Sequence, residues 1–152
     1  MEIRDCMKQK VISILDTATV WEAARVCVEQ HVGTLPIVDK TGCLIGVLGL
    51  SDLLKLELPD FVDLLSDVDF VHDFGAVETT RPTPELLQQP VRVLMRPVTS
   101  VVEDCGLLRA YALMRQHNLH DIPVVTNTGT LVGIASRVDI GTAILAVWKI
   151  EK

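Results

Sequence analysis

The chain has 152 residues, of which 49% are hydrophobic and 22% charged; this balance fits one globular domain or two small halves and excludes disordered and fibrous proteins. A formal charge of −6 has the wrong sign for gripping nucleic acid through its phosphates. No apolar run reaches the ~20 residues of a membrane span, and residues 1–10 lack an apolar signal-peptide core, so we expect a soluble cytoplasmic protein without nucleic-acid or membrane partners.

The chain repeats itself at a spacing of 87 residues, without a gap, over about forty residues. The matched pairs are Val11 and Val98, Ser13 and Ser100, Ala23 and Ala110, Pro36 and Pro123, Val38 and Val125, Thr41 and Thr128, Gly42 and Gly129, Leu44 and Leu131, Gly46 and Gly133, and Asp52 and Asp139. Because both turn residues and apolar positions match, chance is a poor explanation. We expect a first repeat in residues 1–56, a linker in 57–90 and a second repeat in 91–152.

The first repeat predicts the element order strand, helix, strand, strand, helix. A short strand at 11–15 precedes a helix that Thr19 and Glu22 begin as a capping box, with His31 as its C-terminal cap. Two apolar runs at 35–39 and 43–49, joined by a turn that ends in Gly42, predict a hairpin. Asp52 opens the closing helix.

The linker at 57–90 is acidic and longer than a simple connection requires. An amphipathic helix is expected after Pro59, with an apolar side and an acidic side; these are Phe61, Leu64, Leu65 and Val68 against Asp60, Asp63 and Asp67. The aspartates lack the Gly and closing Glu of an EF-hand, which favours a solvated face over calcium binding. Thr83 and Pro84 predict a further short helix. The apolar side either covers the repeats or meets a partner.

The second repeat predicts the same order, with strands at 98–102, 122–126 and 130–136. Gly106 takes the cap position before its first helix, and Asp139 opens the last. The last helix is expected over residues 140–150, with one face formed by Ile140, Ile144, Val147 and Trp148. That face makes either a homodimer contact or core packing within the chain. Half a chain buries too little to fold alone, so the two repeats should pack sheet to sheet around one core.

These motifs resemble the CBS (cystathionine beta-synthase) domain, present as a tandem pair. The resemblance rests on residues 35–39 with Gly42 and 46–52, and on residues 122–125 with Gly129 and 133–139. It implies an α+β fold in which two β-α-β-β-α repeats form a pseudo-twofold pair. It also implies clefts that bind AMP, ADP, ATP or S-adenosylmethionine, and frequent dimerisation.

A nucleotide needs a carboxylate for its ribose hydroxyls, and amides, hydroxyls and positive charge for its phosphates. The second repeat offers these groups in Asp139, Ser136 and Arg137. By resemblance, adenine would lie near Thr99 and Ser100, and further candidates line the cleft, namely His120, Asp121, Ile122 and Pro123. Mere helix capping is the alternative role for Asp139.

The first repeat keeps the aspartate, as Asp52, but differs from the second repeat at the other candidate ligand positions, so we expect a weaker or empty cleft there. Gly49 stands for Ser136, Leu50 for Arg137, and Gly33 and Thr34 for His120 and Asp121.

The favoured hypothesis is a regulatory module that senses an adenosine nucleotide and acts through a homodimer or a protein partner regulated in trans, with no metal or required cofactor. A dimerising scaffold with empty clefts is the alternative. An enzyme ranks third, because no nucleophile and base occur at a recognisable spacing. The four cysteines, Cys6, Cys27, Cys43 and Cys105, show neither disulfide nor zinc spacing.

Overall fold

The computed structural model describes residues 1–57 and 82–148. The first repeat contains β1 (Ile14–Leu15), α1 (Val20–Gln30), β2 (Thr34–Val38), β3 (Leu44–Gly49) and α2 (Leu50–Leu54). The second contains β4 (Val101–Val102), α4 (Leu107–Gln116), β5 (Asp121–Val125), β6 (Leu131–Ser136) and α5 (Arg137–Leu145). Short helices complete the description: η1 (Ile3–Asp5), α3 (Pro84–Leu87) and η4 (Val91–Val93). The amphipathic helix expected after Pro59 lies outside the described residues.

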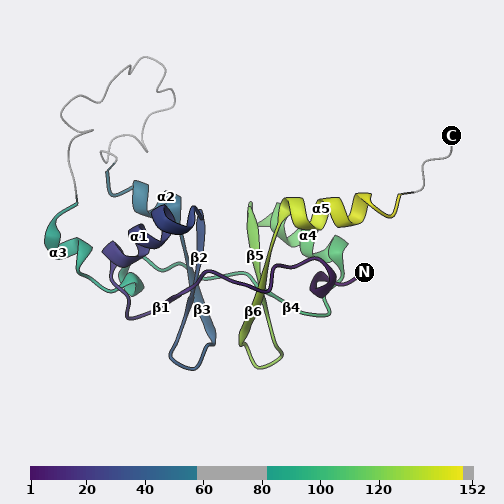
Figure 1. The fold of residues 1–152 in the computed structure, drawn as a ribbon, viewed down its shortest axis with the longest axis horizontal. Coiled ribbons are helices and arrows are strands. Elements are labelled where there is room, and N and C mark those ends of the chain that lie inside the picture. The colour runs from purple at the N-terminus through teal and green to yellow at the C-terminus, as the bar shows by residue number, and fades with distance from the viewer. Residues whose placement is uncertain (58–81, 149–152) are drawn as a thin grey trace, which may run out of the picture.

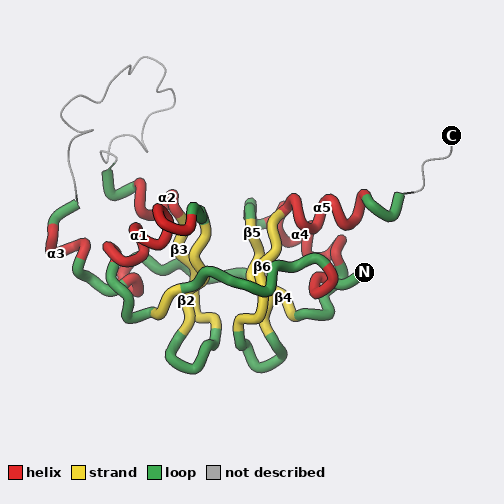
Figure 2. The backbone as a smooth tube through the Cα atoms, in the orientation of Figure 1, coloured by secondary structure: helices red, strands yellow, loops and turns green. Residues whose placement is uncertain are grey.

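The two repeats form two three-stranded sheets, ordered β1-β2-β3 and β4-β5-β6. In each sheet the first strand pairs in parallel with the second, which forms an antiparallel hairpin with the third. The sheets face each other in the middle of the molecule, and the helices lie on the outer sides (Figures 1 and 2). The expected α+β fold and sheet-to-sheet packing are thereby confirmed, but the buried residues form one cluster in each repeat and not the single core expected.

The hairpin tips also join the two sheets. Leu44 donates its backbone N–H to the carbonyl of Gly129, and Leu131 donates to that of Gly42, at 3.0 and 3.1 Å. Gly42 and Gly129 have φ angles of +87° and +92°, a backbone region that side chains with a Cβ rarely adopt. These turn glycines therefore let each hairpin close and present its backbone to the other.

Local signals explain most helix boundaries. Glu22 donates its N–H to the Thr19 hydroxyl, and Thr19 donates its N–H to the Glu22 carboxylate, both at 3.1 Å, which confirms the capping box. His31 ends α1 in the left-handed region at φ +54°. Thr83 caps α3, whose first residue is Pro84, as expected.

The last helix differs from its prediction over residues 140–150. It begins at Arg137, because Ser136 is the N-cap and Asp139 the third helical residue, and it ends at Leu145. Ile140 is fully buried in the core of the second repeat, whereas Val147 and Trp148 lie beyond the helix and are exposed. The four residues therefore do not form one helical face: Ile140 and Ile144 pack within the chain, and a dimer contact by this end of the chain stays a prediction.

The segment that precedes the first strand of each repeat packs against the other repeat. We name residues 1–8 the first leading segment and residues 90–96 the second. The first forms bridges from Glu2 to Gly106 and from Lys8 to Ile134, and Ile3 is buried in the core of the second repeat. In Figure 1 the chain runs from the N-terminus beside the second repeat, across the molecule, to β1.

The second leading segment makes the reciprocal contacts. Arg96 pairs with Val47 of β3, Pro90 bridges to Thr19, and Val91 is buried in the core of the first repeat. Each repeat therefore completes its core with a side chain from the sequence before the other.

Two glycines allow the leading segments to cross the sheets. A Cβ added at Gly133 would overlap with Met7, and one added at Gly46 would overlap with Met95. Gly46 and Gly133 are a matched pair of the sequence repeat. Glycine recurs at this position because a methionine of a leading segment, Met95 or Met7, packs closely against it.

Among the described residues, no helix combines the length and apolarity needed to cross a bilayer.

Replacing a buried leading-segment residue should destabilise the whole molecule. Val91→Ala removes two methyl groups from a site with no exposed surface, so we expect the free energy of unfolding to fall by about 2 kcal/mol in urea denaturation. Val93→Ala is the matched control, because Val93 lies in the same short helix with 53% of its surface exposed. Equal losses of stability from the two substitutions would contradict the packing of Val91 in the core of the first repeat.

Candidate functional site

Asp139 lies where β6 passes into α5, and its carboxylate has two partners, the backbone of Ser136 and the side chain of Lys8. Its Oδ2 accepts the N–H of Ser136 at 2.9 Å, while the Ser136 hydroxyl accepts the N–H of Asp139 at 3.0 Å. Lys8 of the first leading segment places its Nζ 3.7 Å from the same Oδ2. We call Asp139, Ser136 and Lys8 the Asp139 site.

Asp52 occupies the equivalent place between β3 and α2. Its Oδ2 accepts the N–H of Gly49 at 2.7 Å and the Nε–H of Arg96 at 2.9 Å. Arg96 belongs to the second leading segment, so this site also combines the two repeats. We call Asp52, Gly49 and Arg96 the Asp52 site.

Aligning the two repeats of the sequence did not show that Lys8 and Arg96 belong to the aspartate sites. Each follows a methionine, Met7 or Met95, but the two Met-basic pairs are 88 residues apart, one more than the spacing of the repeat. A comparison at 87 residues sets Lys8 against Met95 and hides the equivalence. The methionine followed by a basic residue occurs in both repeats and could have revealed the equivalence, but only in an alignment shifted by one residue.

Arg137, expected to reach phosphate, is engaged elsewhere. Its Nε donates to the carbonyl of Leu119 at 2.5 Å, and its Nη2 donates to Asn118 Oδ1 at 3.4 Å. The guanidinium therefore stabilises the connection between α4 and β5. A phosphate contact by Arg137 stays a prediction.

Asp121 links the two repeats. Its Oδ2 accepts the hydroxyl hydrogen of Thr34 at 3.0 Å, and the two residues are equivalent positions of the repeat. His120, beside it, is exposed and accepts the N–H of Arg137 through its backbone carbonyl at 3.1 Å. Ile122 and Pro123 follow as buried residues of β5.

Thr99 and Ser100 lie in the stretch between Arg96, which is bonded to β3 of the first repeat, and β4 of the second. Their predicted grouping with Asp139 has no direct contact to support it among the described residues, and it stays a prediction. Each leading segment lies against the repeat of the other half. The stretch that leaves the Asp139 site after Lys8 is therefore residues 9–13, and not the stretch that contains Thr99 and Ser100.

The two aspartates retain capacity to bind a ligand. Within residues 1–57 and 82–148, neither carboxylate uses its Oδ1 in a hydrogen bond or ion pair. A carboxylate can accept several hydrogen bonds, so the Oδ1 atom of each aspartate remains available as an acceptor while the protein contacts of Oδ2 are kept.

The cysteines and the acidic groups offer little chemistry of their own. Burial, together with the charges of Asp139 and Asp5, raises the pKa of the Cys6 thiol, and burial raises the pKa of Cys27 and Cys105. Raised pKa values keep these thiols protonated and weak as nucleophiles. In the described part of the chain, no group of three His, Cys, Asp or Glu side chains could hold a metal ion.

Hydrogen bonds among its own turn residues lower the pKa of Asp39. The hydroxyl of Thr41 makes the largest contribution, and backbone N–H groups of the turn add to it. Asp39 therefore shapes the hairpin tip.

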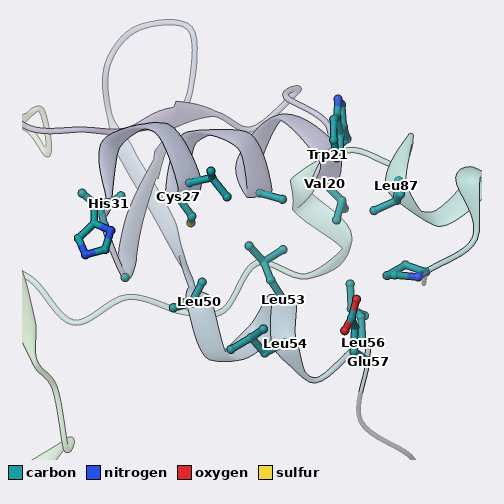
Figure 3. A pocket seen from close by; sticks show the side chains of 15 residues that line it. Val20, Trp21, Cys27, His31, Leu50, Leu53, Leu54, Leu56, Glu57 and Leu87 are labelled. Carbon is teal, nitrogen blue, oxygen red and sulfur yellow. The ribbon is translucent and has the colours of Figure 1, made fainter. Parts of the chain in front are cut away.

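An apolar groove of about 830 Å³ lies between α1 and α2, on the outer side of the first repeat (Figure 3). Aliphatic side chains such as Val20, Leu53 and Leu54 line it, with Trp21 at one end. The second repeat has a related, smaller groove of about 370 Å³ between α4 and α5, lined by Leu108 and Val138 among others. Most of the lining residues are apolar, although the smaller groove also contains Arg137, and neither groove is lined by Asp52 or Asp139.

Sequence comparison agrees with the repeat and with the fold. The chain matches the CBS domain family over residues 3–58 and again over residues 91–146. The chain belongs to the CBS domain family. The uncharacterized protein MJ1426 of Methanocaldococcus jannaschii is 27% identical over 156 residues, which covers 95% of this chain and 92% of that protein. By contrast, the chain spans between 22% and 28% of three longer curated relatives.

Solved CBS structures have the same fold. The crystal structure of CBSX2 in complex with AMP superposes with a TM-score of 0.71 at 26% identity, covering 96% of this chain and 97% of that one. The CBS domain pair of MJ0100, in complex with 5′-methylthioadenosine and S-adenosylmethionine, superposes with a TM-score of 0.68 at 20% identity and covers the same shares of the two chains.

Arg137→Ala should lower stability, because it removes the donors to Leu119 and Asn118. We expect a loss of about 1 kcal/mol in the free energy of unfolding, measured by urea denaturation. Arg115→Ala, an exposed substitution in the last turn of α4, should change it by less than about 0.5 kcal/mol. Unchanged stability combined with lost nucleotide affinity would instead assign Arg137 to phosphate binding.

Proposed function

We propose that this CBS pair is a regulatory module that binds an adenosine nucleotide at the Asp139 and Asp52 sites. The observation that carries the proposal is the repeated arrangement of a largely buried carboxylate with one engaged oxygen, one available oxygen and a basic side chain beside it. The carboxylate suits ribose hydroxyls, and the basic group suits phosphate.

The relationship to CBSX2 supports the ligand class. That protein was crystallised with AMP, and its likeness to this chain extends over almost the whole length of both. We therefore place AMP first among the candidate ligands, with ADP, ATP and S-adenosylmethionine as competitors to be ranked by measurement.

Each aspartate site joins a leading segment of one repeat to a helix start of the other. A ligand bound there contacts both repeats and favours the relative orientation in which those contacts are best. This coupling is the proposed route from nucleotide binding to a change in an outer surface.

We propose that the outer surface is a homodimer contact formed by the two apolar grooves. Leu54, Leu108 and Val138 leave 55%, 73% and 70% of their surfaces exposed on the helical side. Because the two grooves lie at equivalent places of the pseudo-twofold pair, a second copy related by a twofold axis can cover both at once. A scaffold with the same dimer contact and no ligand remains the competing hypothesis.

Adenosine nucleotides should raise the thermal midpoint of unfolding. A ligand at 100 times its dissociation constant stabilises the protein by about 2.7 kcal/mol, which corresponds to several degrees at this size. Differential scanning calorimetry with AMP, ADP, ATP and S-adenosylmethionine, and with GTP as a control, measures the shift.

Replacing both site aspartates, Asp52→Ala with Asp139→Ala, should abolish the shift. Asp104→Ala, which removes an exposed carboxylate elsewhere in the second repeat, should preserve it. If ligand-free protein shows no shift with any adenosine compound, the scaffold hypothesis replaces the sensor.

The dimer contact predicts a change in molecular mass. Leu54→Glu with Leu108→Glu places charges in the apolar contact and should convert a dimer to a monomer in sedimentation equilibrium. Leu15→Glu, at a 48% exposed position in β1, is the control and should leave the mass unchanged. A monomeric parent protein, or a dimer that survives the double substitution, would exclude this interface.

A further inference from the structure

The two aspartate sites differ in their basic group. Arg96 donates its Nε–H to Asp52 Oδ2 at a hydrogen-bonding distance of 2.9 Å, and the Arg96 side chain is 53% exposed. Lys8 lies 3.7 Å from Asp139, and its side chain is 66% exposed. The Asp52 site therefore holds its positive charge in a more fixed position.

Arg96 has donors to spare. A guanidinium carries five N–H groups, and the contact with Asp52 uses the one on Nε. No described residue accepts a hydrogen bond from the Nη atoms of Arg96. The carboxylate fixes the plane of the guanidinium, and its remaining N–H groups form the fork that matches phosphate oxygens.

Gly49 lets the guanidinium of Arg96 lie close to the backbone at the start of α2. A Cβ built on Gly49 would have as its nearest neighbours Asp52 Oδ2 at 3.3 Å, Arg96 Nη2 at 3.4 Å and Ser51 Oγ at 3.5 Å. At the equivalent place in the second repeat, the side chain of Ser136 caps α5. The absence of a side chain at residue 49 therefore gives the Arg96 guanidinium the room in which it contacts Asp52.

We propose that Arg96 binds the phosphate of a nucleotide at the Asp52 site, so that this site selects phosphorylated adenosine over adenosine with an uncharged or cationic 5′ group. This inference rests on the proposed function and reverses the expectation from sequence that the first repeat holds the weaker site. The sequence comparison found no base there because Arg96 belongs to the other half of the chain.

The test compares AMP with 5′-methylthioadenosine, which has the same nucleoside without phosphate. Both are titrated by calorimetry into the Asp139→Asn variant, which isolates the Asp52 site. Arg96→Gln should weaken AMP binding by about tenfold to a hundredfold, since it removes charged hydrogen bonds, and should change methylthioadenosine binding by less than about twofold.

Two further variants separate phosphate binding from folding. Arg96→Lys keeps the charge and the ion pair but loses the fork, and it should give an intermediate affinity for AMP. Arg92→Gln is the matched control, because Arg92 lies in the same leading segment and pairs with a different carboxylate, Asp16. It should leave both affinities unchanged.

The outcomes distinguish this inference from the proposed function. Arg96→Gln can lower the affinities for AMP and methylthioadenosine equally, or lower neither, while Asp52→Asn abolishes the binding of both. In that case the site binds adenosine and Arg96 is not its phosphate ligand. If the Asp139→Asn protein binds AMP no better than methylthioadenosine, the selectivity is likewise overturned. If neither the parent protein nor the variant binds any adenosine compound, the proposed function fails and the inference fails with it.

Discussion

The exchange of leading segments is the constraint on which the rest of the molecule depends. Each repeat lacks part of its core until the segment before the other repeat supplies Ile3 or Val91. The backbone bridges at Lys8 and Arg96 then fix these segments along β6 and β3. Because the same bridges carry the basic side chains to the aspartates, core packing and the assembly of both sites follow from one arrangement.

The pseudo-twofold symmetry holds for the backbone and breaks at the side chains that determine binding. Gly46 and Gly133 both admit a methionine, and Asp52 and Asp139 both accept the N–H of the residue three positions earlier. The neighbouring positions differ: glycine accompanies arginine at one site, and serine accompanies lysine at the other. A bulky guanidinium needs the room that glycine leaves, whereas the serine hydroxyl caps a longer helix. The two sites can therefore differ in ligand preference within one fold.

Signals that act over a few residues were predicted well. The capping box of Thr19 and Glu22, the left-handed cap at His31 and the glycine turns at Gly42 and Gly129 depend on neighbours within four residues, so the sequence reports them directly. The last helix was misplaced because its apolar residues were counted as one face, while the cap at Ser136 starts the helix earlier. The hydrogen bonds of Arg137 to Leu119 and Asn118 were not foreseen, because these partners lie 18 and 19 residues away in the sequence.

The sequence by itself determined the two repeats, their element order and the two aspartates, since matched spacing and local capping express all of these. The motifs within the repeats carried the resemblance to CBS domains. The tertiary structure alone decided which leading segment lies against which repeat. It thereby decided that Lys8 accompanies Asp139 and that Arg96 accompanies Asp52. The physical reason is that periodicity shows which residues share a face, whereas the partner of that face is chosen by packing between segments distant in the chain.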